Sequence, residues 1–399
     1  MKPLKLLALL SVIALIAAAC ATDASDDTPG PAGDAPAAED TTPPAEAGVD
    51  DSDDGADAAD EGRLSVVVTT NIWGDIVSNI VGDDADIEIL FPIGADPHDY
   101  QMSSAQAAAM ESADLVVVNG LALEEGVLDV VEGLEEDGAN VVEVALGVEL
   151  IAFGGGGHDH EDEDHAHEED EDHDHEDEDH AHEEDEDHAH EEELVCDPGA
   201  GHDHEGEEDH SDEEEGHEGH NHAEGSCDPH VWMDPLRVAE AVEMLAAELT
   251  ALDSSIDWMA RASAYADELR ALDAEVVALL GSIPEDQRKL VTNHDAFGYF
   301  ADRYDFEVIG TVIPSGTTLA DPSSAELAEL VEILVDENIS VIFAETIEPS
   351  ALADAVADEV GAVTVVELFT GSLGGPDSGA ESYLDLIRTN AERIAGALS

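Results

Sequence analysis

Leu64-Ser65-Val66-Val67-Val68 is the first of a series of short, almost wholly apolar runs in this chain of 399 residues. The runs that follow it are Ile87-Glu88-Ile89-Leu90-Phe91, Leu115-Val116-Val117-Val118 and Val141-Val142-Glu143-Val144. Ala-rich stretches of helical character, such as 104–112, lie between some of them. Strands of a parallel sheet are covered on both faces, so they appear as continuous apolar runs that alternate with helices. This pattern predicts an α/β lobe with a mostly parallel sheet.

The same pattern returns after residue 288 and predicts a second α/β lobe. The predicted strands are 290–292, 308–312, 341–343 and 363–366, and the predicted helices are 323–338 and 382–398. Ser323 and Glu326 have the spacing of a capping box at the start of the first of these helices.

Helical periodicity fills 235–281 between the two halves, with a break at Asp253-Ser254-Ser255. We therefore expect an N-terminal lobe over 63–234, a helical linker over 235–287 and a C-terminal lobe over 288–399.

The N-terminal segment predicts export and a lipid anchor. Two lysines precede an apolar run over 6–19, which has the length of a secretory signal sequence and is too short to span a bilayer. Ala17-Ala18-Ala19-Cys20 follows and looks like the cleavage site of bacterial lipoproteins, although Ala stands where Leu is usual. We expect a lipoprotein signal peptide over 1–20 and acylation at Cys20, which would place the chain on the outer face of the cell membrane, in the periplasm if the cell has two membranes. An ordinary signal peptide with a stray cysteine is the alternative.

The charge of the chain is strongly negative. It has 100 Asp and Glu against 11 Lys and Arg, for a formal net charge of −89. Such a field repels nucleic acid and attracts cations, so we expect no nucleic-acid partner. Residues 21–62 lack aromatic side chains and are rich in Ala, Asp, Pro and Gly, which predicts a disordered acidic linker.

A segment over 158–222 interrupts the first lobe with His, Asp and Glu and almost nothing apolar. Its first fifteen residues, 158–172, are repeated unchanged at 173–187. This composition predicts a disordered loop whose His-x-His pairs bind several Zn²⁺ ions weakly. A low-complexity acidic tract without selected function is the alternative.

Only His98, His230 and His294 of the 19 histidines lie outside this loop. They occur in Gly94-Ala95-Asp96-Pro97-His98-Asp99-Tyr100, Asp228-Pro229-His230-Val231-Trp232-Met233-Asp234-Pro235 and Thr292-Asn293-His294-Asp295-Ala296-Phe297-Gly298-Tyr299-Phe300. Each stands beside turn residues or a strand end, and ligands of open α/β sheets bind beyond the carboxyl ends of strands. A lone histidine is more often structural, but three in such places indicate a metal site.

In this order the three motifs resemble those of the ABC-transporter solute-binding proteins specific for zinc and manganese, most closely the ZnuA-type zinc proteins. The resemblance runs from about residue 64 to the C-terminus. It implies two α/β lobes joined by a long backbone helix, best matched by about 256–280, with the metal in the cleft between them. It also implies His98, His230 and His294 as ligands, and an ABC permease with its ATPase as partners. We expect a monomer.

The resemblance favours Zn²⁺ as the transported ligand. Manganese members usually carry Glu at the position matched by His294, and neutral imidazoles suit tetrahedral zinc. Two departures leave the fourth ligand open between water and an unnamed group. Pro97 stands where some zinc members have Glu, and Gly371 stands where many relatives place an Asp ligand.

Cys196 and Cys227 bracket the second half of the His-rich loop. In an exported protein a disulfide between them is the first expectation, and a pair of thiolates that bind metal in the loop is the alternative.

A metal-import receptor is thus the predicted function, with two rivals from other classes. One is an extracellular zinc store that acts through the loop. The other is a zinc hydrolase, because three histidines plus water is also the pattern of catalytic zinc, although neither HExxH nor GxSxG is present. We therefore expect no enzyme. An adhesin role, sometimes ascribed to relatives, leaves no mark in the sequence.

Overall fold

The computed structural model of the chain describes residues 62–153, 196 and 226–399. The predicted signal peptide, the lipidation residue Cys20, the linker up to residue 61 and the His-rich loop apart from Cys196 lie outside the described residues. Within these described ranges, no helix combines the length and the apolar character that crossing a bilayer requires.

The N-terminal lobe is built on a parallel sheet with the strand order β2-β1-β3-β4. The strands are β1 (Leu64–Val68), β2 (Ala85–Ile89), β3 (Leu115–Val118) and β4 (Val141–Glu143), and the helices are α1 (Asn71–Val81), α2 (Ser104–Ser112) and α3 (Leu128–Glu136). In β3, Leu115 and Val117 pack into one hydrophobic core, whereas Val116 and Val118 pack into another on the opposite face. A strand covered on both faces needs apolar residues at every position, which explains the continuous run in the sequence.

The C-terminal lobe repeats this arrangement with a parallel sheet of order β6-β5-β7-β8. Its strands are β5 (Lys289–Thr292), β6 (Glu307–Thr311), β7 (Val341–Glu345) and β8 (Thr364–Leu368), and its helices are α6 (Gly298–Tyr304), α7 (Ser324–Asp336), α8 (Ala351–Val360) and α9 (Tyr383–Ala397). The predicted capping box is present, since Ser323 and Glu326 cap the start of α7 reciprocally. The expected class of two α/β lobes with parallel sheets is confirmed.

One strand was placed too late from the sequence. The predicted strand 87–91 is displaced from the observed β2, which ends at Ile89. Leu90 and Phe91 nevertheless continue the ladder, because their N–H groups donate to the carbonyls of Val68 and Thr69 at 2.9 Å each.

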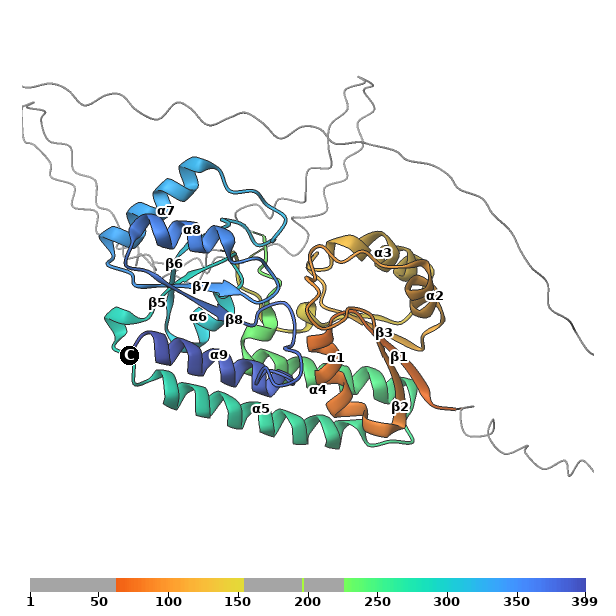
Figure 1. The fold of residues 1–399 in the computed structure, drawn as a ribbon. Helices are drawn as coiled ribbons and strands as arrows, with labels where there is room; N and C mark the ends of the chain where they lie inside the picture. The colour runs from red at the N-terminus through yellow and green to blue at the C-terminus, as the bar shows by residue number, and fades with distance from the viewer. Residues whose placement is uncertain (1–61, 154–195, 197–225) are drawn as a thin grey trace, which may run out of the picture. The chain divides into compact units, whose positions relative to one another are not determined.

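Two helices join the lobes, α4 (Pro235–Leu252) and α5 (Trp258–Leu280). The predicted break lies between them, and Asp257 begins α5 by accepting a hydrogen bond from the backbone N–H of Ala260. Helix α5 packs against α4, against α1 of the first lobe and against α9 of the second (Figure 1). The largest hydrophobic core includes residues of both sheets together with these helices. This core is continuous across residues 234 and 287. The lobe boundaries expected at these two residues therefore stay predictions.

Candidate metal centre

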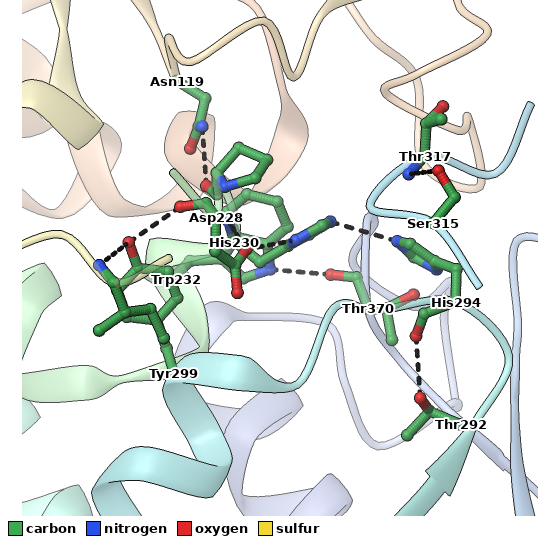
Figure 2. A network of polar contacts seen from close by, with 12 residues as sticks. Asn119, Asp228, His230, Trp232, Thr292, His294, Tyr299, Ser315, Thr317 and Thr370 are labelled. Atoms are coloured by element: carbon green, nitrogen blue, oxygen red, sulfur yellow. Dashed lines mark hydrogen bonds and ion pairs between the residues drawn. The ribbon is translucent and has the colours of Figure 1, made fainter. Parts of the chain in front are cut away.

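The structure brings the three predicted histidines together. His98 lies in the loop after β2, His230 just before the 3-10 turn Val231–Met233, and His294 two residues after β5. Each is 1 % exposed. One ring nitrogen from each lies within 4.8 Å of the others, and among the described residues this is the group of His, Cys, Asp and Glu side chains that fits a metal ion. The Nε2 atoms of His230 and His294 lie 3.2 Å apart, and Figure 2 shows these two nitrogens directed towards each other.

A repeated local motif sets the backbone at two of these positions. Asp96-Pro97-His98 and Asp228-Pro229-His230 have the same residue order. In each, the Asp Oδ1 atom accepts the backbone N–H of the histidine two residues later, at 3.0 Å for His98 and 2.9 Å for His230. An Asp that bonds its own backbone two residues on forms a tight turn. Both histidines are therefore presented by the same kind of turn.

Each imidazole has a carboxylate near its Nδ1 atom. Asp228 Oδ1 lies 2.7 Å from His230 Nδ1, and Glu345 Oε1 forms a short bond with His294 Nδ1. Glu125 Oε1 lies 3.7 Å from His98 Nδ1, which is too long for a hydrogen bond. A carboxylate that accepts from Nδ1–H fixes the tautomer and leaves the Nε2 lone pair free for a metal. The arrangement at His230 and His294 is that of metal-ligating histidines.

His98 supplies an independent sign that the site is built for a ligand. Its two ring nitrogens are buried and have no hydrogen-bond partner among the described residues. A buried polar group without a partner costs free energy and is rare in native proteins. Likewise, two Nε2 lone pairs that face each other repel unless a proton or a cation lies between them. A divalent ion bound by three imidazoles relieves both problems.

The electrostatics of the site couple metal binding to protons. Burial opposes the ionisation of Glu345, but the His294 ring outweighs it and lowers the pKa of this carboxyl. Burial also opposes the charging of His294, and Glu345 outweighs it, so the pKa of His294 is raised. At Asp228 burial prevails over the hydrogen bond from His230 N–H and raises the pKa to about 7. A metal ion that binds His294 therefore competes with a proton that Glu345 holds there.

The two residues that depart from the expected motifs, Pro97 and Gly371, lie against each other. A Cβ atom added to Gly371 would lie 2.7 Å from Pro97 Cδ and 2.9 Å from Ile347 Cδ1. Real Cβ atoms do not approach other atoms this closely. Position 371 therefore has no room for a metal-binding side chain while Pro97 occupies its place.

Residues beside the His-rich loop connect directly to the site. The structure joins Cys196 to Cys227 in a disulfide, the first of the two alternatives left open by the sequence. Cys227 pairs with Ala152 in an antiparallel bridge, and the next residue, Asp228, donates its backbone N–H to the carbonyl of Ile151 at 2.9 Å. The carboxylate partner of His230 is thus part of the stem from which the loop departs.

The profile of the family described as "Zinc-uptake complex component A periplasmic" matches residues 66–397. The chain belongs to this family, ZnuA. It is accordingly an extracytoplasmic metal-binding receptor of the ABC metal-importer class. ZnuA-family members bind metal ions as solutes and are not enzymes, which sets the hydrolase alternative aside.

Curated relatives include binders of two different metals. The chain is 25 % identical over 338 residues to the manganese-binding lipoprotein MntA of Halalkalibacterium halodurans, a match that covers 84 % of this chain and 89 % of MntA. It is 27 % identical over 337 residues to the zinc-binding lipoprotein AdcA of Streptococcus pneumoniae serotype 4, covering 84 % of this chain and 56 % of AdcA. The chain therefore spans only about half of the length of AdcA.

Solved structures support the two-lobed fold. The periplasmic zinc-binding protein TroA of Treponema pallidum superposes with a TM-score of 0.62 at 26 % identity, over 85 % of this chain and 100 % of TroA. A manganese-bound periplasmic protein of Candidatus Liberibacter asiaticus has a TM-score of 0.60 at 22 % identity, over 84 % of this chain and 100 % of that one, and shows the fold alone. Because the relatives MntA and AdcA are named for manganese and for zinc, similarity does not fix the metal.

The sequence singled out the three histidines that the structure brings together, but it did not indicate the carboxylates beside them. Asp228 belongs to the same motif as His230, and its position two residues before this histidine was a usable signal. Glu345 ends the buried strand β7, where an acid is unusual enough to be noticed. Glu125 had no such signal, because it begins the short turn Glu125–Val127 in a chain with 100 acidic residues.

Proposed function

We propose that this chain captures Zn²⁺ between its two lobes with His98, His230 and His294 and delivers it to the permease of an ABC importer. The observation that carries the proposal is the set of three buried imidazoles whose ring nitrogens lie within 4.8 Å of one another. Two of them have a carboxylate bonded to Nδ1, which directs Nε2 towards the shared centre.

Zinc is favoured over manganese by the donor atoms. The group of possible ligand atoms within 4.8 Å consists of histidines and contains no carboxylate among the described residues. Asp228 and Glu345 bond to the far nitrogens of their histidines instead. Nitrogen ligands in a site of low coordination number suit Zn²⁺, whereas Mn²⁺ prefers oxygen ligands in octahedral geometry. The zinc-binding names of AdcA and TroA are in line with this choice.

The proposal includes a place and partners for the protein. Acylation at Cys20 would tether the chain to the outer face of the cell membrane, as the lipoprotein names of MntA and AdcA suggest by analogy. Its partners would be the permease and the ATPase of the importer, and the chain would act as a monomer.

Zinc titration of the full-length chain and of a chain without residues 158–222 tests the proposal. Calorimetry gives the affinities and mass spectrometry identifies the bound metal. We expect one tight zinc site to persist after the deletion. Replacing His98, His230 or His294 by Ala should weaken that site by about 1–3 kcal/mol or more, judged from structural zinc sites.

His202→Ala in the His-rich loop is the matched control for the full-length chain, and it should leave the tight site unchanged. Unaltered tight binding in His294→Ala would disprove the shared site. If no tight site survives the deletion, the protein is instead a zinc store that acts through the loop.

A further inference from the structure

The loop between β6 and α7, residues 312–323, crosses from the C-terminal lobe to the N-terminal lobe. The Thr317 hydroxyl donates a hydrogen bond to Glu125 Oε1 at 2.6 Å. The neighbouring Thr318 hydroxyl donates to Asp96 Oδ2. Both threonines are largely buried, at 3 % and 9 % exposure. These are polar contacts between lobes in a place where water has little access, so the loop makes a defined connection.

The same loop is also attached to the residues on either side of His294. Ile313 N–H donates to the carbonyl of Asn293 at 2.7 Å, and Asp295 N–H donates to the carbonyl of Ser315 at 3.0 Å. Within the loop, the backbone N–H of Thr317 donates a hydrogen bond to the Ser315 hydroxyl at 3.3 Å (Figure 2). One short segment thus links the backbone around His294 with a carboxylate of the opposite lobe.

Gly316 fixes how closely this loop can approach the first lobe. A Cβ atom at position 316 would lie 2.0 Å from Phe153 Cζ, at the point where the described part of the first lobe ends. A side chain at position 316 would therefore require the Phe153 ring or the loop to shift. The two threonines that bond to the N-terminal lobe follow directly after this glycine.

The acceptor of Thr317 is the oxygen that faces His98. Glu125 Oε1 receives the Thr317 hydroxyl and is also the atom 3.7 Å from His98 Nδ1. The other two histidines of the cluster have carboxylates bonded directly to their rings, but among the described residues neither ring nitrogen of His98 has a hydrogen-bond partner. Within its own lobe the His98 ring is therefore the least constrained of the three, and the orientation of Glu125 decides whether it gains a partner.

We propose that Thr317 is a positioning residue for metal capture: from the C-terminal lobe it holds Glu125, and through Glu125 it orients the His98 imidazole of the N-terminal lobe. This inference rests on the proposed function. It means that the lobe carrying His294 helps to set the geometry of a ligand on the other lobe. Metal binding and contact between the lobes are then coupled, because separating the lobes removes the hydroxyl that fixes Glu125.

Thr317→Val in the full-length protein tests the coupling, because valine has the shape of threonine without the hydroxyl. We expect tight-site zinc affinity to fall about 10- to 100-fold, the usual cost of losing a residue that orients a metal ligand. Release of zinc to an excess of chelator should accelerate correspondingly. Thr317→Ser keeps the hydroxyl, so its zinc affinity should stay near the wild-type value.

Thr250→Val is the matched control. The Thr250 hydroxyl bonds to the carbonyl of Ala246 within α4 and does not belong to the site. The thermal unfolding of all metal-free variants is measured alongside, and a loss of zinc affinity without a comparable loss of metal-free stability separates positioning from a structural role.

A double-mutant cycle with Glu125→Gln gives a second, independent criterion. If Thr317 acts through Glu125, the loss in Thr317→Val combined with Glu125→Gln should be smaller than the product of the two single losses. Wild-type affinity and release rate in Thr317→Val would overturn the inference, as would fully additive effects. If instead the wild type itself shows no tight site that depends on His98, the proposed function fails and not merely this part of it.

Discussion

Replacing Glu345 by Gln removes one charge from the proposed metal centre and preserves the shape of the side chain. Glu345 is 1 % exposed, and its Oε1 atom accepts the backbone N–H of His294 at 3.1 Å as well as the ring Nδ1–H. Its Oε2 atom accepts the hydroxyl of Thr370. A glutamine keeps a carbonyl oxygen towards His294 and places its amide group against Thr370, whose hydroxyl accepts as readily as it donates. The substitution therefore tests the charge and little else.

The expected cost follows from the role of the carboxylate. A carboxylate hydrogen-bonded to a metal-binding histidine fixes its orientation and increases its basicity, and losing such a partner costs about 10- to 100-fold in metal affinity. This range corresponds to about 1.4–2.8 kcal/mol. We expect the full difference at about pH 8, where histidines of ordinary pKa are neutral.

The difference between the two proteins should narrow on acidification. Burial lowers the pKa of His294, but Glu345 outweighs it and raises the pKa overall, so in the wild type a proton begins to compete with zinc at a higher pH than at an ordinary histidine. Without the negative charge, the pKa of His294 falls and proton competition begins at a lower pH. Wild-type affinity therefore decreases first. In the metal-free protein, the stability from this raised pKa is present below the ordinary histidine pKa and is lost as the pH rises through the raised one.

Competition with a chelator of known affinity measures the zinc affinity of both proteins from about pH 8 to about pH 6, around the ordinary histidine pKa. It tests the affinity difference at the upper pH and its decrease on acidification. Glu367→Gln on the adjacent strand β8 is the control, because this side chain is exposed. Wild-type affinity of Glu345→Gln at the upper pH would refute the role of the carboxylate. A difference that widens on acidification would refute the linkage to His294.

Two further outcomes follow from the shape and the donors of the site. At equal free ion concentration, Zn²⁺ should raise the unfolding temperature more than Mn²⁺ does, and equal protection would contradict the selectivity argument. Gly371→Asp should lower the free energy of unfolding of the metal-free protein by about 1–3 kcal/mol, as overpacking does, without improving Mn²⁺ binding. Chemical denaturation measures the loss of stability, and Mn²⁺ titration measures the affinity. A gain in Mn²⁺ affinity would show that Pro97 and Ile347 move aside for the new side chain.

The fold was predictable because its signal is local and repeated. In runs such as 115–118, consecutive apolar residues pack into the cores on the two opposite faces of the sheet. Ser323 and Glu326 mark the start of a helix within four residues. The predicted ends of a strand were less accurate where the hydrogen bonds between strands continue beyond the regular strand. At Leu90 and Phe91 the ladder continues past the end of β2, so the apolar run does not coincide with the element.

The cluster of three histidines was predictable and most of its environment was not, for one physical reason. Histidine is scarce outside the loop, so His98, His230 and His294 stand out in the sequence. Their neighbours are carboxylates in a chain where acids are everywhere, and some of the contacts that position these carboxylates join residues far apart in the sequence. Glu345 lies 51 residues from His294, and the bond from Thr317 to Glu125 spans 192 residues. Such pairings are set by how the strands and loops pack, which the spacing of residues along the chain does not contain.

The two departures from the expected metal motifs, Pro97 and Gly371, prove to be one feature. They are far apart in the sequence, but a Cβ atom at position 371 would lie 2.7 Å from the Pro97 ring. A proline ring from one lobe thus fills the space that a side chain at position 371 would need. Carbon atoms bind no metal, so the fourth position of a tetrahedral Zn²⁺ on this side would be left to water, while Mn²⁺ would lack the oxygen ligands it prefers. If the three histidines bind the ion as proposed, this contact is one reason to expect zinc in preference to manganese.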